Sequence, residues 1–111
     1  MVVSRLLAVA AVVGGLHGVV MRGPTMPVCR VGTPCTAPAV GAVLVFSTGG
    51  HMSAQVRSGR DGRYSIRLAP GLYMVRLGSI PRIGFGLKPT AVRVVGGATR
   101  RVDFMIDTGI R

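Results

Sequence analysis

The sequence contains no glutamate, no tryptophan and only three aspartates among 111 residues. General acid–base catalysis needs a positioned pair of titratable groups, and only two histidines, His17 and His51, accompany these aspartates. No serine lies in the Gly-x-Ser-x-Gly context of a nucleophile elbow. We therefore expect a protein that is not an enzyme and that needs no cofactor.

Aromatic residues are also scarce, since two tyrosines and three phenylalanines make up 5% of the chain. Fourteen basic residues oppose the three aspartates and give a net charge of +11. Such an excess can indicate nucleic-acid binding. Here the basic residues are scattered singly through alternating segments, without an aromatic stacking platform. We therefore expect that the protein does not bind nucleic acid. The expected partner is an unknown protein or an anionic cell-surface polymer. The alternative is that the basic residues bind no partner and form a solvated face.

No apolar run is long enough to span a bilayer as a helix. Residues 1–15 have a short start that contains Arg5, followed by an apolar run from Leu6 to Val13 and then by small residues, which is the layout of a signal peptide. No Ala-x-Ala motif follows the run, so we place the cleavage near Gly15. An uncleaved anchor, which would be the only contact with a membrane, or a misassigned start codon is the alternative. Residues 16–111 would then form one secreted or cell-surface domain.

Only two cysteines are present, Cys29 and Cys35, and five residues separate them. An even number of cysteines in a short exported chain indicates a disulfide. Because the loop that it closes is short, the entropic stabilisation is at most about 2 kcal/mol. The disulfide would act locally, by fixing a loop that contains proline and glycine.

A soft-metal site is the main alternative for this part of the chain. Thioether, thiolate and imidazole groups are ligands that copper ions favour, and the candidates are Met21, Met26, Cys29, Cys35, His51 and Met52. The cysteine spacing is not the Cys-x-x-Cys of strong metal loops, and methionine also fills apolar cores. A disulfide would consume both thiolates. We expect no metal site, with a copper-type site using Met21, Met26, His51 and Met52 as the alternative.

Beyond Gly15 the apolar residues alternate with a period of two, which predicts strands rather than helices. Seven such segments, separated by turn residues, are typical of a β-sandwich. The predicted strands are residues 16–23, 39–48, 53–58, 63–68, 72–77, 90–95 and 99–106.

Turn residues separate these predicted strands. Asp61-Gly62 tolerates the positive φ of a tight turn, and Pro70-Gly71 presets a second reversal. Both turns are predicted to join consecutive antiparallel strands. Gly96-Gly97 is predicted to close a last hairpin, and residues 78–89 to form a crossover loop.

The alternation also predicts which side chains face the core. This set comprises Tyr64, Ile66, Tyr73, Val75, Val92, Val102 and Phe104. In contrast, Val43, Val45 and Met74 point away from the main apolar stripe, beside Arg67 and Arg76. They form either a surface that docks a partner or a face that the loop 78–89 covers, and the sequence favours neither.

The stretches "PAVGAVLVF", "GRDGRYSIRLAPGLYMVRL" and "TAVRVVGGATRRVDFMI" resemble the carboxypeptidase regulatory-like domain, a transthyretin-like (prealbumin-like) sandwich. The recurring elements of that family correspond to Gly41-Ala42, Asp61-Gly62-Arg63-Tyr64 and Pro70-Gly71-Leu72-Tyr73. The two-cysteine loop "GPTMPVCRVGTPC" and the terminal "DTGIR" are similar to small secreted bacterial members. The resemblance covers residues 16–111.

This resemblance implies a seven-stranded antiparallel β-sandwich that serves as an accessory, non-catalytic module. The chain has no His-x-x-Glu zinc motif, so peptidase activity is not carried over. The terminal "DTGIR" also differs from the Tyr-Arg-Gly-Ser end of the transthyretin-type hydrolase. We expect a structural or binding module outside the cytoplasm, with an extracytoplasmic copper-type protein as the alternative.

Overall fold

The computed structural model describes residues 12–32, 34–78 and 86–108, and every regular element in these ranges is a β-strand. No helix in these ranges is long and apolar enough to cross a membrane. The strands are β1 (Gly14–Gly23), β2 (Ala37–Pro38), β3 (Val43–Thr48), β4 (His51–Arg57), β5 (Arg63–Leu68), β6 (Gly71–Leu77), β7 (Gly86–Lys88), β8 (Ala91–Val94), β9 (Thr99–Arg101) and β10 (Phe104–Asp107).

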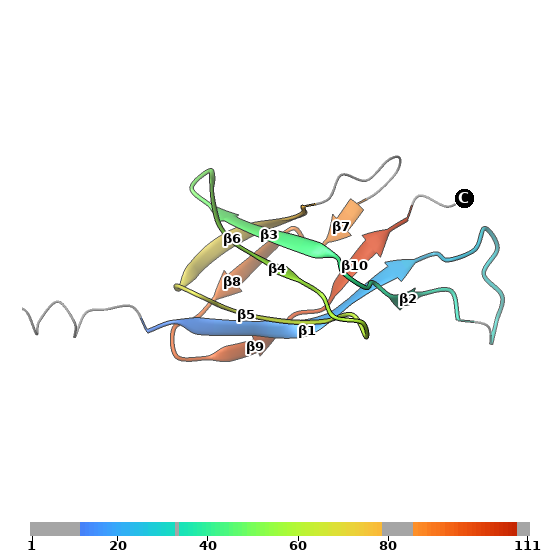
Figure 1. The fold of residues 1–111 in the computed structure, drawn as a ribbon, viewed down its shortest axis with the longest axis horizontal. Helices are drawn as coiled ribbons and strands as arrows, with labels where there is room; N and C mark the ends of the chain where they lie inside the picture. The colour runs from blue at the N-terminus through green and yellow to red at the C-terminus, as the bar shows by residue number, and fades with distance from the viewer. Residues whose placement is uncertain (1–11, 33, 79–85, 109–111) are drawn as a thin grey trace, which may run out of the picture.

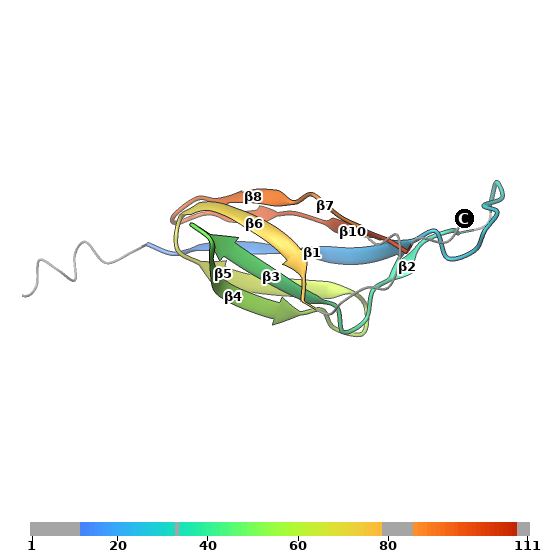
Figure 2. The same cartoon turned by 90° about the horizontal axis from the view of Figure 1, so that it is seen from above.

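Two sheets pack against each other (Figures 1 and 2). In the six-stranded sheet β1 is the central strand: β5 and β2 pair with it antiparallel, β9 and β10 pair with it in parallel, and β7 pairs with β10. The four-stranded sheet has the antiparallel order β4-β3-β6-β8. This arrangement confirms the all-β sandwich that the sequence predicts.

The core lies between the sheets and is built from alternate residues of each strand, as the period of two requires. Phe104 contacts Phe46 edge-on with ring centroids 6.4 Å apart, and Tyr64 at 5.5 Å. Of the seven predicted core residues, five are buried, and Ile66 and Val102 are half-buried against the same cluster.

The sequence prediction of seven antiparallel strands is wrong in two details. β2 and β7 were missed because two or three residues are too short to show alternation. The predicted strand 99–106 divides into β9 and β10, and both run parallel to β1. The division falls at Val102-Asp103, where the Val102 N–H donates to the carbonyl of His17 and the Asp103 carboxylate accepts the Val19 N–H. A side chain thus replaces a backbone carbonyl in the ladder.

The turns Asp61-Gly62, Pro70-Gly71 and Gly96-Gly97 lie at the predicted positions but do not form hairpins. Each connects a strand of one sheet to a strand of the other, namely β4 to β5, β5 to β6 and β8 to β9. At the first turn Gly62 has φ 82° and donates to the carbonyl of Gly59, while Asp61 accepts the N–H of Arg63. Turn chemistry specifies a tight reversal, but it does not specify whether the next strand stays in the same sheet.

The central strand begins earlier than the predicted strand 16–23. β1 begins at Gly14, which pairs with Leu68, and Gly15 pairs with both Arg67 and Thr99. Two residues assigned to the leader are therefore part of the central strand. Residues 1–11 lie outside the described residues.

Candidate functional site: a basic cleft over the central strand

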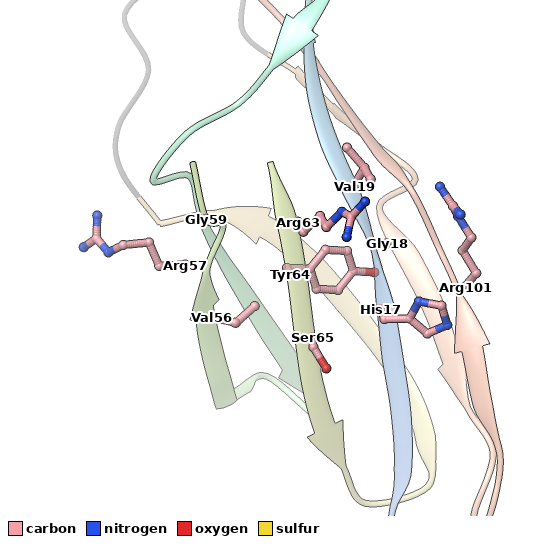
Figure 3. Close-up of a pocket in the computed structure, with 10 residues that line it drawn as sticks. All are labelled: His17, Gly18, Val19, Val56, Arg57, Gly59, Arg63, Tyr64, Ser65 and Arg101. Carbon is pink, nitrogen blue, oxygen red and sulfur yellow. The ribbon is translucent and has the colours of Figure 1, made fainter. Parts of the chain in front are cut away.

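A cleft of about 670 Å³ opens over β1 and β5 (Figure 3). Four of the residues that line it carry basic or imidazole side chains. The lining is His17, Gly18, Val19, Val56, Arg57, Gly59, Arg63, Tyr64, Ser65 and Arg101. Strand alternation produces this cluster, because Arg63 and Ser65 occupy the exposed positions of β5 while Tyr64 between them is buried.

The pairing of β1 with two neighbours brings the cluster together. His17 lies directly between Ser65 of β5 and Arg101 of β9, and Val19 lies next to Arg63. Figure 3 shows Arg63, His17 and Arg101 around β1, whereas the guanidinium of Arg57 points away from them. Arg57 donates to the carbonyl of Gly41 instead, at 3.2 Å.

Two aspartates hold two of these arginines. The Nε of Arg63 lies 3.3 Å from Asp61 Oδ2, and the Nε of Arg101 lies 3.2 Å from Asp103 Oδ1. All four side chains are more than half exposed, so these ion pairs add little to stability. The ion pairs instead orient the guanidinium groups, because each carboxylate contacts its arginine through Nε.

Asp103 also has a structural role. Its Oδ1 accepts the Val19 N–H at 2.9 Å, and this hydrogen bond, with a smaller contribution from Arg101, lowers the pKa of the carboxyl below its ordinary value. Asp103 is therefore an ionised acceptor at neutral pH, not a proton donor.

Tyr64 forms the buried side of the cleft and is equally unsuited to proton transfer. Its hydroxyl donates to the carbonyl of Val102 at 2.5 Å. Burial, and then the negative charge of Asp103, raise the pKa of Tyr64 above its ordinary value. The phenol stays protonated, so the described lining of the cleft offers arginine cations and hydroxyl groups. Such a set binds anions.

The predicted disulfide is present: Cys29 and Cys35 are bonded in the segment between β1 and β2. The N–H of Thr25 donates to the carbonyl of Cys35 at 2.9 Å and closes the base of the loop. The loop extends from one end of the sandwich (Figure 1).

The alternative copper ligands are not brought together. Met21 and Met26 lie near the disulfide loop, whereas His51 and Met52 begin β4, at the opposite end of the sandwich (Figures 1 and 2). The disulfide occupies both thiols. Among the described residues, no group of three or more His, Cys, Asp or Glu side chains is placed to hold a metal ion.

The surface that was predicted around Val43, Val45 and Met74 is not continuous. Val45 is only 3% exposed, and the backbone at Gly78 lies close to the side chains of Val43 and Val45. Met74 is 56% exposed. Arg76 shares its strand, but Arg67 belongs to the other sheet, so the predicted group of side chains does not form one patch. The loop that was expected to cover this face lies mostly outside the described residues.

Comparison with known proteins supports the fold. Neither a family model nor a curated protein matches the chain. Among solved structures, GBS52, the minor pilin of Streptococcus agalactiae, is similar with a TM-score of 0.57 and 16% identity over 87% of this chain and 45% of the pilin. The Bacillus anthracis TIE protein has a TM-score of 0.54 and 19% identity over 86% of this chain and 16% of that protein. The chain thus spans less than half of either protein, and at these identities the likeness shows the fold alone.

Sequence reasoning missed the cleft. Its arginines were counted among the singly scattered basic residues, and His17 was not assigned to a site. The signal lay in the alternation of β5 combined with the pairing of β1 and β9, which joins residues more than eighty positions apart. No local pattern reveals that pairing.

Proposed function

We propose that this protein is a non-catalytic module of carboxypeptidase regulatory-like type that acts as a structural or binding unit outside the cytoplasm. The disulfide Cys29–Cys35 on a small all-β sandwich carries the proposal. Disulfides persist in oxidising compartments and are rare in the cytosol. The signal-like layout of residues 1–15 agrees with export.

The chemistry of the cleft supports a binding role. Within the described ranges, Asp61 and Asp103 hold arginines, and Tyr64 stays protonated. Binding therefore accounts for the cleft better than catalysis does.

The fold likeness to a minor pilin supports a structural role, and the turn residues Asp61-Gly62 and Pro70-Gly71 support the regulatory-like type. In that family such sandwiches are accessory domains. The assignment concerns the class of the module and names no ligand.

The test is the intact mass of the native protein recovered from outside the producing cells, before and after reduction and alkylation. We expect loss of the leader, and two alkyl groups added only after reduction. Because Gly14 and Gly15 pair in the sheet, a cut that leaves β1 whole falls before Gly14. A full-length chain retained in the cytoplasm with two free thiols would refute the extracytoplasmic assignment.

A further inference from the structure

We propose that the basic cleft binds the oxyanions, phosphate or carboxylate, of an extended anionic polymer that lies along β1. This inference rests on the proposed function, that the module acts by binding rather than by catalysis. It adds the site, the residues and the chemical class of the ligand.

The first support is the length of the hollow. A second depression of about 380 Å³ continues along β1 from the cleft, and the two share Ser65. Gly15 contributes no side chain there, and Arg67 and Thr99 lie on either side of it. Together the two depressions form one groove over the first half of β1.

The second support is the spacing of the cations along this groove. Arg63 and Arg67 occupy exposed positions four residues apart on β5, which is about 13 Å along an extended strand. One phosphate or carboxylate group is only a few ångströms across, so where both side chains stand away from the sheet a single ion does not contact both arginines. A chain of anions can, and the hydroxyls of Ser65 and Thr99 lie between them as further donors.

The third support is the positioning of the guanidinium groups. Arg63 and Arg101 are each held through Nε by an aspartate two residues away. The hydrogen bonds from Arg101 to Asp103 and the ion pair between Arg63 and Asp61 are made through Nε. A guanidinium fork that is already oriented suits a phosphate or carboxylate, because fewer rotamers are lost on binding.

The experiment measures binding of the mature protein, with its disulfide intact, to defined probes by titration calorimetry at low and physiological salt. The probes are inorganic phosphate, a linear polyphosphate, poly-glutamate, and a single-stranded oligonucleotide with as many phosphates as the polyphosphate. We expect a polyphosphate or poly-glutamate complex that weakens as salt rises, and at least tenfold weaker binding of inorganic phosphate at equal anion concentration. The ratio between the two polymers identifies which oxyanion the groove prefers.

Two double variants localise the site. Arg63→Gln with Arg101→Gln removes two charges from the groove, and we expect about tenfold weaker polymer binding. Arg76→Gln with Arg93→Gln removes the same charge from exposed positions of the other sheet and is expected to change the affinity less than about twofold. Both doubles are compared only after their melting curves show cooperative folding. Amide shifts of Gly18, Val19 and Ser65 on titration provide a readout in the unmodified protein.

Equal losses in the two doubles would overturn the groove in favour of diffuse attraction to the whole basic surface. Inorganic phosphate binding as tightly as the polymers would overturn the extended ligand, and no binding of any probe would overturn the proposal. Tighter binding of the oligonucleotide would replace the polymer by a nucleic acid. None of these results bears on export or the disulfide, which the mass measurement tests separately.

Discussion

Apart from the tyrosines, Ser58 is the one buried side chain with a polar group among the described residues, and its replacement by alanine tests how the sandwich is closed beside the cleft. The side chain is 3% exposed. Its hydroxyl donates to the carbonyl of Ala39 at 2.5 Å and accepts the N–H of Ala42 at 2.8 Å. These bonds join the end of β4 to the segment that leads into β3.

Ser58→Ala removes both hydrogen bonds and leaves two backbone groups without this partner. Each bond contributes about 1 kcal/mol net, so we expect the free energy of unfolding to fall by about 2 kcal/mol. For a domain of this size 1 kcal/mol corresponds to a melting shift of about 4–8 °C, which gives a decrease of about 8–16 °C. Thermal and urea unfolding monitored by circular dichroism measure both quantities.

Ser53→Ala is the matched control, because Ser53 is an exposed serine of β4, the strand that Ser58 directly follows. We expect it to change stability by less than about 0.5 kcal/mol. If Ser58→Ala is no more destabilising than Ser53→Ala, the hydroxyl does not tie these segments together and the reasoning is refuted.

Two further substitutions test the junction between β9 and β10. In Gly18→Ala the new methyl would overlap the carbonyl oxygen of Val102 and lie 2.7 Å from Asp103 Oδ1, so we expect a loss of about 3 kcal/mol in urea unfolding; Gly15→Ala, whose nearest contact is 3.4 Å, should lose less than half as much. In Asp103→Asn the pH dependence changes. Since the fold lowers the pKa of Asp103, its stabilisation is present above the ordinary value of about 4 and is lost as pH falls through the lowered value. The variant should therefore be less stable than the wild type at pH 7, and the two should converge as the pH falls below the lowered pKa of Asp103; a constant difference would contradict the assigned pKa direction.

Local patterns in the sequence predicted most of the longer strands and the positions of the reversals correctly. The alternation in Arg63–Leu68 coincides with β5, since one face of that strand is buried and the other is solvated. The positive φ at Gly62 follows from the Asp-Gly pair. These features depend on a few neighbouring residues and can therefore be predicted from a single sequence.

The pairing of strands depends on distant parts of the chain, and there the sequence was insufficient. The Gly96-Gly97 turn is compatible with a hairpin, but β8 joins β6 and β9 joins β1, because the chain crosses between sheets at this point. The same crossing brings Arg101 beside His17 and creates the groove. The candidate site was hidden because it is a product of topology and not of a motif.

Because the chain has only three aspartates and no glutamate, replacing one of them provides a further test of the groove. Asp61 interacts with Arg63 through Nε and accepts the Arg63 N–H at 3.2 Å. Asp61→Asn raises the net charge by one and keeps a residue that favours the turn. Diffuse attraction predicts tighter polymer binding by this variant, because its charge is higher. Positioning predicts weaker binding, because the guanidinium of Arg63 loses the carboxylate that orients it.

We expect a loss of about twofold to threefold in polyphosphate or poly-glutamate affinity for Asp61→Asn, measured by the same calorimetric titration at physiological salt. The matched comparison is Arg76→Gln, which alters the charge by one on the other sheet and leaves the groove unchanged. An affinity that follows net charge, rising in Asp61→Asn and falling in Arg76→Gln, would show that the aspartate only neutralises its neighbour. An affinity that falls in Asp61→Asn and stays nearly constant in Arg76→Gln is the pattern that an oriented arginine produces.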